Sequence, residues 1–73
     1  MSNHLNNLIM ELPPKRKEIF LLSRIEGLSY QEISEKMNIS IKTVEVQISL
    51  ALKYIRTRIK KILPVIILIF NIL

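Results

Sequence analysis

The spacing of apolar and polar positions after residue 28 predicts two consecutive helices joined by a tight turn. Ser29 and Glu32 have the spacing of a capping box, in which each side chain satisfies a backbone N–H of the opening helical turn. Asn38 follows the first helix at the turn, where Asn tolerates the left-handed backbone conformation that a sharp reversal needs. Ser40 is then an N-cap candidate for the second helix. Apolar residues recur along that helix at alternating spacings of four and three, which predicts a single buried seam: Val44, Ile48, Ala51, Ile55, Ile59 and Ile62.

The N-terminal part of the chain predicts two further helices. The first contains a helical apolar stripe and is expected to end before Pro13, because the residue before a proline is pushed out of the α region. The second is expected to begin at Pro14, to continue to about residue 26 and to be capped by Gly27. Its expected buried residues are Ile19, Phe20, Leu21, Leu22 and Ile25. Its basic residues, expected in solvent, are Lys15, Arg16, Lys17 and Arg24.

These patterns predict an all-α fold with four helices, near residues 4–12, 14–26, 30–37 and 41–62. No segment shows the alternation of a strand, so no wing is expected beside the helices. A short helix, a tight turn and a capped second helix form the helix-turn-helix pattern. A helical hairpin packed for stability alone is the plainer interpretation of the same pattern. The 73 residues suffice for one small domain, expected over residues 1–61.

The last 12 residues, ILPVIILIFNIL, form an apolar tail (residues 62–73) interrupted only by Pro64 and Asn71. A membrane-spanning helix needs about 20 apolar residues, so the tail is too short to cross a bilayer. Two interpretations remain. The tail packs against the core or against a partner, or it makes a one-sided contact with a membrane surface, helped by the basic residues that precede it.

The composition argues against catalytic chemistry. The chain has no cysteine, one histidine and one glycine, and all six acidic residues are glutamates without a paired spacing. A metal site, a nucleophile with its base, and a glycine-rich phosphate loop therefore lack the residues they need. We expect neither enzymatic activity nor a bound cofactor.

The charge is distributed unevenly along the chain. Residues 1–45 hold six basic and six acidic side chains, whereas residues 46–73 hold five basic side chains and no acidic one. The net charge of +5 is thus carried by the C-terminal half of the long helix. Such a one-sided excess indicates a polyanionic partner, either nucleic acid or an anionic membrane surface.

The predicted seam determines which side chains of the long helix face outward. At about 100° per residue, the opposite side carries Lys42, Glu45, Val46, Ser49 and Lys53. Lysines suit phosphates or a guanine edge, a glutamate can accept from the cytosine amino group, and a valine can contact a thymine methyl. Thr43 lies at the flank, within reach of a phosphate. Tyr30 and Gln31, at the start of the preceding helix, are expected to contact the DNA backbone.

Four blocks of the sequence resemble region 4 of bacterial sigma-70-type factors, and most closely those of the extracytoplasmic-function group. The blocks are Leu-Pro-Pro-Lys at 12–15, Lys-Glu-Ile-Phe at 17–20, Glu-Gly-Leu-Ser-Tyr-Gln-Glu-Ile at 26–33 and Ile-Ser-Ile-Lys-Thr-Val-Glu at 39–45. The resemblance covers about residues 5–61. It implies a cytoplasmic four-helix module whose last helix reads the −35 promoter element. The same module is expected to dock on the β flap of RNA polymerase and to be masked by an anti-sigma factor.

By position, the resemblance implies promoter-reading residues at Glu45, Val46, Ser49 and Leu50, with Lys42 and Thr43 at the helix start. Leu50 is apolar where the family more usually has a polar contact. Region 2, which in that family reads the −10 element, has no counterpart in these 73 residues. We therefore expect an isolated domain or a truncated product that does not initiate transcription alone.

Two alternatives remain open. The LuxR-type DNA-binding domain of response regulators shares part of the motif. Its sequence usually starts differently from the Leu-Pro-Pro-Lys block found here, and it usually has histidine where this chain has Gln47. In the second alternative, the basic helix and the apolar tail serve a partner protein or a membrane surface, and the helix-turn-helix is only a scaffold.

Overall fold

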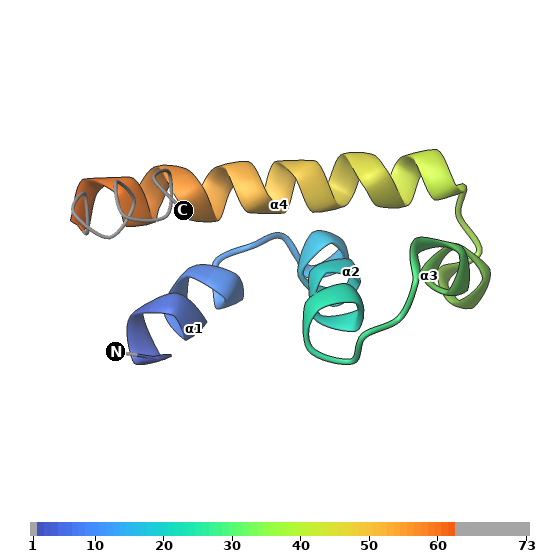
Figure 1. Ribbon diagram of the computed structural model, residues 1–73, viewed down its shortest axis with the longest axis horizontal. Helices are drawn as coiled ribbons and strands as arrows, with labels where there is room; N and C mark the ends of the chain where they lie inside the picture. The colour runs from blue at the N-terminus through green and yellow to red at the C-terminus, as the bar shows by residue number, and fades with distance from the viewer. Residues whose placement is uncertain (1, 63–73) are drawn as a thin grey trace, which may run out of the picture.

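The computed structural model describes residues 2–62, with side-chain environments for residues 5–59, and shows an all-α fold. Four helices follow in order: α1 (Ser2–Met10), α2 (Pro14–Arg24), α3 (Tyr30–Met37) and α4 (Ile41–Ile62) (Figure 1). The predicted fold class is confirmed, and the bounds of α3 and α4 agree with the predicted ones. The apolar tail lies outside the described residues except for Ile62, the last residue of α4.

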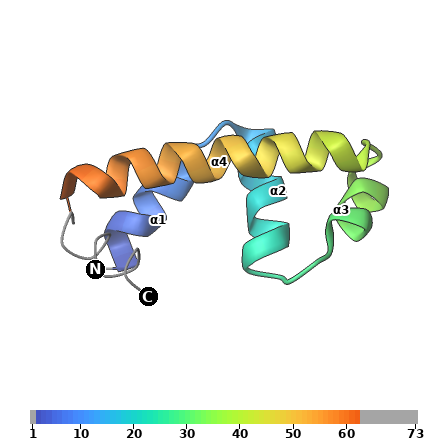
Figure 2. The ribbon, with the colours of Figure 1, turned by 45° about the horizontal axis from the view of Figure 1, so that its top comes forward.

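Helix α4 runs the length of the molecule, and the other three helices lie along one side of it (Figure 1). Helix α3 lies beside the N-terminal end of α4, α2 beside its middle and α1 towards its C-terminal end (Figure 2). Over the described residues, no helix combines the length and the apolarity that crossing a bilayer requires. One face of α4 therefore serves as the packing surface for the whole domain.

The hydrophobic core contains residues from all four helices and from the segment between α1 and α2. Ile19 of α2, Ile33 of α3 and Val44 of α4 are fully buried. The predicted seam is confirmed at its first four positions, since Val44, Ile48, Ala51 and Ile55 are all buried, and Ile59 is half-buried against the core. The remaining core residues are Leu8, Ile9, Leu12, Phe20 and Leu22.

Local hydrogen bonds fix both ends of α3, as the sequence predicts. The Glu32 backbone N–H donates to Ser29 Oγ at 3.0 Å, and the Ser29 backbone N–H donates to Glu32 Oε1 at 2.8 Å, which completes the capping box. Asn38 adopts the left-handed conformation, with φ 57° and ψ 48°. The Ile39 N–H then donates to the Ser34 carbonyl at 3.0 Å, and the Ile39 side chain packs against the core. The turn therefore directs the chain into α4.

The bounds of α1 and α2 differ from the predicted ones. Helix α1 begins at Ser2, two residues before the predicted start, and ends at Met10, two residues before the predicted end. Leu12 lies in a turn after the helix, since a residue that precedes a proline is pushed out of the α region. Helix α2 ends at Arg24, two residues before the predicted end.

The early end of α2 changes the environment of Ile25, which was expected in the core. Ile25 is the C-cap residue, and its side chain is 70% exposed. The Leu21 carbonyl accepts from the N–H groups of both Ile25 and Glu26, and Gly27 follows with φ +75°. The prediction for Ile25 was wrong because the helical periodicity does not extend that far.

A polar contact joins the end of α1 to α4. The hydroxyl of Tyr54 donates to Glu11 Oε1, and the Arg58 guanidinium lies 4.7 Å from the centroid of the Tyr54 ring. The hydrogen bond to Glu11 raises the pKa of Tyr54 above its ordinary value of 10.0, and partial desolvation adds to the rise. This contact lies in the C-terminal half of α4, away from the turn that follows α3.

Replacement of Ile33 by alanine tests the core. We expect Ile33→Ala to lower the free energy of unfolding by about 2–5 kcal/mol, since the lost side chain leaves a cavity in a site with no exposure. Ile25→Ala is the matched control, and its effect should stay within about 0.5 kcal/mol because that side chain is mostly in solvent. Urea denaturation followed by circular dichroism measures both. Similar losses for the two variants would contradict the packing described.

The raised pKa of Tyr54 gives a prediction about pH. The fold favours the neutral phenol, so its stabilising contribution is present below the ordinary pKa and is lost as the pH rises through the raised pKa of the folded protein. In Glu11→Ala we expect the ionisation of Tyr54, followed by ultraviolet absorbance, at a lower pH than in the unaltered chain. Tyr54→Phe identifies which absorbance change belongs to this residue. An unchanged midpoint in Glu11→Ala would show that the hydrogen bond does not hold the proton.

Candidate nucleic-acid interface

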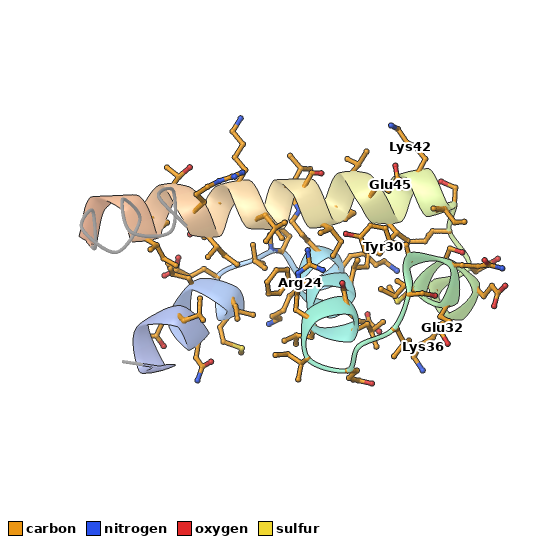
Figure 3. All side chains as sticks on the ribbon, in the orientation of Figure 1. Arg24, Tyr30, Glu32, Lys36, Lys42 and Glu45 are labelled. Atoms are coloured by element: carbon orange, nitrogen blue, oxygen red, sulfur yellow. The ribbon has the colours of Figure 1, made fainter. Side chains whose placement is uncertain are left out.

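The side of α4 that faces away from the other helices is the candidate interface, here called the outer face. All of its members are exposed to solvent: Lys42, Glu45, Val46, Ser49, Leu50 and Lys53. Figure 3 shows Lys42 pointing away from α1, α2 and α3. The predicted outward orientation of this face is confirmed, whereas its contact with DNA stays a prediction.

The outer face is held in place by the seam behind it. Val44 and Ala51 have no exposed surface and Ile48 is 2% exposed, so a rotation of α4 would bring apolar side chains into water. Successive residues are separated by about 100° around the helix axis. Fixing the seam therefore fixes the direction of Lys42, Ser49 and Lys53.

Hydrogen bonds at the start of α4 order its first turn. The Thr43 backbone N–H donates to Ser40 Oγ at 2.9 Å, as expected for an N-cap. The Ser40 hydroxyl in turn donates to Thr43 Oγ1, also at 2.9 Å. Thr43 is exposed beside the outer face, and its hydroxyl can still donate a hydrogen bond while it accepts from Ser40.

The two candidate residues at the start of α3 lie in different surroundings. Gln31 is exposed, and its amide Nε2 donates to Glu35 Oε2 at 3.4 Å. Tyr30 is half-buried and packs against the core. In Figure 3 Tyr30 lies on the side of α4 where α2 and α3 pack, opposite Lys42. The structure thus groups the candidates of α4 on one surface and leaves Tyr30 apart from them.

A polar contact that the sequence did not predict connects α2 to the middle of α4. Arg16 Nε donates to Gln47 Oε1 at 2.9 Å, and both side chains are half-buried. The basic residues of α2 were expected in solvent, and this expectation was wrong for Arg16 and Lys17, which are half-buried, and correct for Lys15 and Arg24. The sequence offered one signal of this contact. Gln47 is a polar residue beside the buried seam, at a position where an apolar residue would also fit.

The charges of α4 suit a polyanion. The helix contains one acidic residue, Glu45, whereas its basic residues are Lys42, Lys53, Arg56, Arg58, Lys60 and Lys61. Lys42, Lys53 and Arg56 are exposed, and Arg58 lies over the Tyr54 ring. The positive end of the helix dipole lies at the start of α4, next to Lys42. In the part of the chain that the structure describes, no group of three His, Cys, Asp or Glu residues could hold a metal ion.

Comparison with known proteins identifies a family and a relative. Residues 3–55 match the family model described as "Sigma-70, region 4". Among curated proteins, the chain is similar to the ferric citrate uptake sigma factor FecI of Escherichia coli (strain K12), with 36% identity over 50 residues. The similarity covers 68% of this chain and 29% of FecI, so the chain corresponds to less than a third of that relative. No solved structure matches the chain significantly.

The contact between Arg16 and Gln47 gives a testable coupling. In a double-mutant cycle of Arg16→Ala and Gln47→Ala, we expect a coupling free energy of about 0.5–1.5 kcal/mol, the usual net contribution of one hydrogen bond. Urea denaturation of the two single variants and the double variant measures it. The control cycle pairs Gln47→Ala with Lys15→Ala, whose exposed side chain should give additive effects. Additivity in both cycles would show that the contact contributes nothing to the fixing of α4.

Proposed function

Since the chain belongs to the sigma-70 region 4 family, whose model matches residues 3–55, we propose that it binds promoter DNA through the outer face of α4. The observation that carries the proposal is the position of this face. It is exposed, rich in hydrogen-bonding and basic groups, and directly opposite a fully buried seam. Helix-turn-helix proteins place the N-terminal part of their second helix in the major groove. Here that part contains the outer face.

The roles of the individual side chains follow from their chemistry. Lys42 and Lys53 neutralise phosphates at either end of the face, which sets the register of the protein without reading sequence. Glu45 accepts a hydrogen bond from a cytosine amino group, and Ser49 can pair with several base edges. The hydroxyl of Thr43 and the amide of Gln31 contact the backbone at the flank. Tyr30, being half-buried, reaches the backbone at most with its hydroxyl.

Within a complete sigma factor, the proposed target is the −35 promoter element, and the module would act in transcription initiation. The sequence resemblance and the match to FecI support this assignment. Residues 1–61 are proposed as the DNA-binding domain, followed by the apolar tail. RNA polymerase core, through its β flap, and an anti-sigma factor are the proposed protein partners. A module of this kind needs no catalytic residue and no cofactor.

We expect the affinity of the chain alone to be low and steeply dependent on salt. A single small domain makes few contacts, so the dissociation constant should lie in the range typical of non-specific binding, about 10⁻⁴–10⁻⁶ M at physiological salt. Fluorescence anisotropy is suited to this range. The duplex used is the one that the chain prefers in a selection from a randomised duplex pool, compared with a scrambled duplex.

Two substitutions separate phosphate contact from base reading. Lys53→Ala should weaken binding to both duplexes about equally and lower the salt slope by about one, whereas Glu45→Ala should change the preference between them by about tenfold. Lys36→Ala is the control for charge, since Lys36 is exposed on α3 and lies far from the outer face in Figure 3. The measurement is an anisotropy titration of each variant over a salt series.

The outcomes bear on different parts of the proposal. An absence of binding at low salt would contradict the DNA-binding function itself. Binding in which Glu45→Ala leaves the sequence preference unchanged would contradict the placement of the outer face in the groove. An equal effect of Lys36→Ala and Lys53→Ala would show that overall charge, and not the outer face, governs the affinity.

A further inference from the structure

We propose that Val46 and Leu50 form an apolar pair that reads the 5-methyl groups of two thymines, so that the preferred DNA site contains thymines within two base pairs of each other. The inference rests on the proposed function and extends it, because it specifies the chemical class of base that the outer face recognises. It also assigns a role to Leu50, which with Val46 makes up the apolar part of the outer face, whose other members are polar or charged.

The exposure and the spacing of these two residues carry the inference. Val46 is 41% exposed and Leu50 is 40% exposed. They are four positions apart on α4, which places their Cβ atoms about 5–6 Å from each other on adjacent turns. Both side chains therefore present methyl groups to solvent at one continuous place on the helix surface.

The pair occupies one side of the outer face. At about 100° per residue, Val46 and Leu50 lie on the flank shared with Thr43, whereas Glu45 and Ser49 lie on the other flank. Lys42 and Lys53 lie along the middle of the face. The outer face thus divides into an apolar side and a hydrogen-bonding side, with cations near its two ends.

Isolated apolar side chains are common on protein surfaces and need no explanation. This pair differs because it lies inside the surface that the basic residues make attractive to a polyanion. A phosphate backbone brought there by Lys42 and Lys53 places base edges against Val46 and Leu50.

Thymine is the base whose chemistry fits the pair. In the major groove thymine presents a methyl group beside its O4 acceptor, whereas guanine, adenine and cytosine present hydrogen-bonding groups and no methyl group. Valine and leucine can neither donate nor accept, so they would remove water from a polar base edge without replacing its hydrogen bonds. The separation of the two side chains is less than two base-pair steps of about 3.4 Å each. The two thymines are therefore neighbours or are separated by one base pair.

Removal of the thymine methyl groups tests the proposal directly. The selected duplex is prepared with thymine and again with deoxyuridine in its place, which deletes the methyl group and leaves base pairing intact. We expect the unaltered 73-residue chain to bind the deoxyuridine duplex about tenfold more weakly, which corresponds to the loss of two buried methyl contacts. The double variant Val46→Ala, Leu50→Ala should bind the two duplexes within about twofold of each other, since it lacks the contacting methyl groups.

Leu52→Ala provides the matched control. Leu52 is an exposed apolar residue of the same helix, 36% exposed, but it lies outside the outer face. Its variant should discriminate between the two duplexes as the unaltered chain does. Circular dichroism should show all variants to be as helical as the unaltered chain, because alanine favours the helix.

Three results would overturn the inference. One is equal binding of the thymine and deoxyuridine duplexes by the unaltered chain. Another is an equal loss on methyl removal in the unaltered chain and in the double variant, which would assign the effect to the DNA. The third is a selected sequence without two thymines in this arrangement. Each of these leaves the DNA-binding function standing, whereas a failure of the proposed function would appear as no binding to any duplex at low salt.

Discussion

The structure depends on the burial of one seam along α4. Val44, Ile48, Ala51 and Ile55 meet the apolar residues of α1, α2 and α3, so each of the three shorter helices packs against the same long helix. In a domain of this size, one shared surface is an economical way to form a core, because the short helices would be marginal in isolation. The same burial keeps the opposite side of α4 in solvent. The stability of the fold and the exposure of the outer face therefore come from one interaction.

Polar contacts complement the seam at different points along α4. Its start is ordered by Ser40, which caps the first turn directly after the left-handed Asn38. Its middle is joined to α2 by the hydrogen bond between Arg16 and Gln47, and a later turn is joined to the end of α1 through Tyr54. Apolar packing tolerates small rotations and shifts, whereas hydrogen bonds are directional. The two contacts with α2 and with the end of α1 therefore add directional restraints to the rotation of α4 that the seam already fixes.

The outer face combines three kinds of chemistry on a short length of helix. Cations at its ends favour a polyanion, hydrogen-bonding groups on one flank suit polar base edges, and an apolar pair on the other flank suits methyl groups. A rigid helix holds these groups at fixed spacings, which is the condition for reading several base pairs together. Membership of the sigma-70 region 4 family and the arrangement of this face are independent observations, and both support the proposed contact with promoter DNA.

The sequence by itself determined the features that arise within a few residues. The capping box, Asn38 and Ser40 predicted the bounds of α3 and α4, and the helical period predicted both the seam and the exposed residues of the outer face. Only the tertiary structure showed that Tyr30 packs against the core and that Ile25 is exposed beyond the end of α2. It alone joined Arg16 to Gln47 across 31 positions and Glu11 to Tyr54 across 43. Caps and periodicity act between neighbours in the chain, whereas these pairings depend on how separate helices approach one another, which no local pattern specifies.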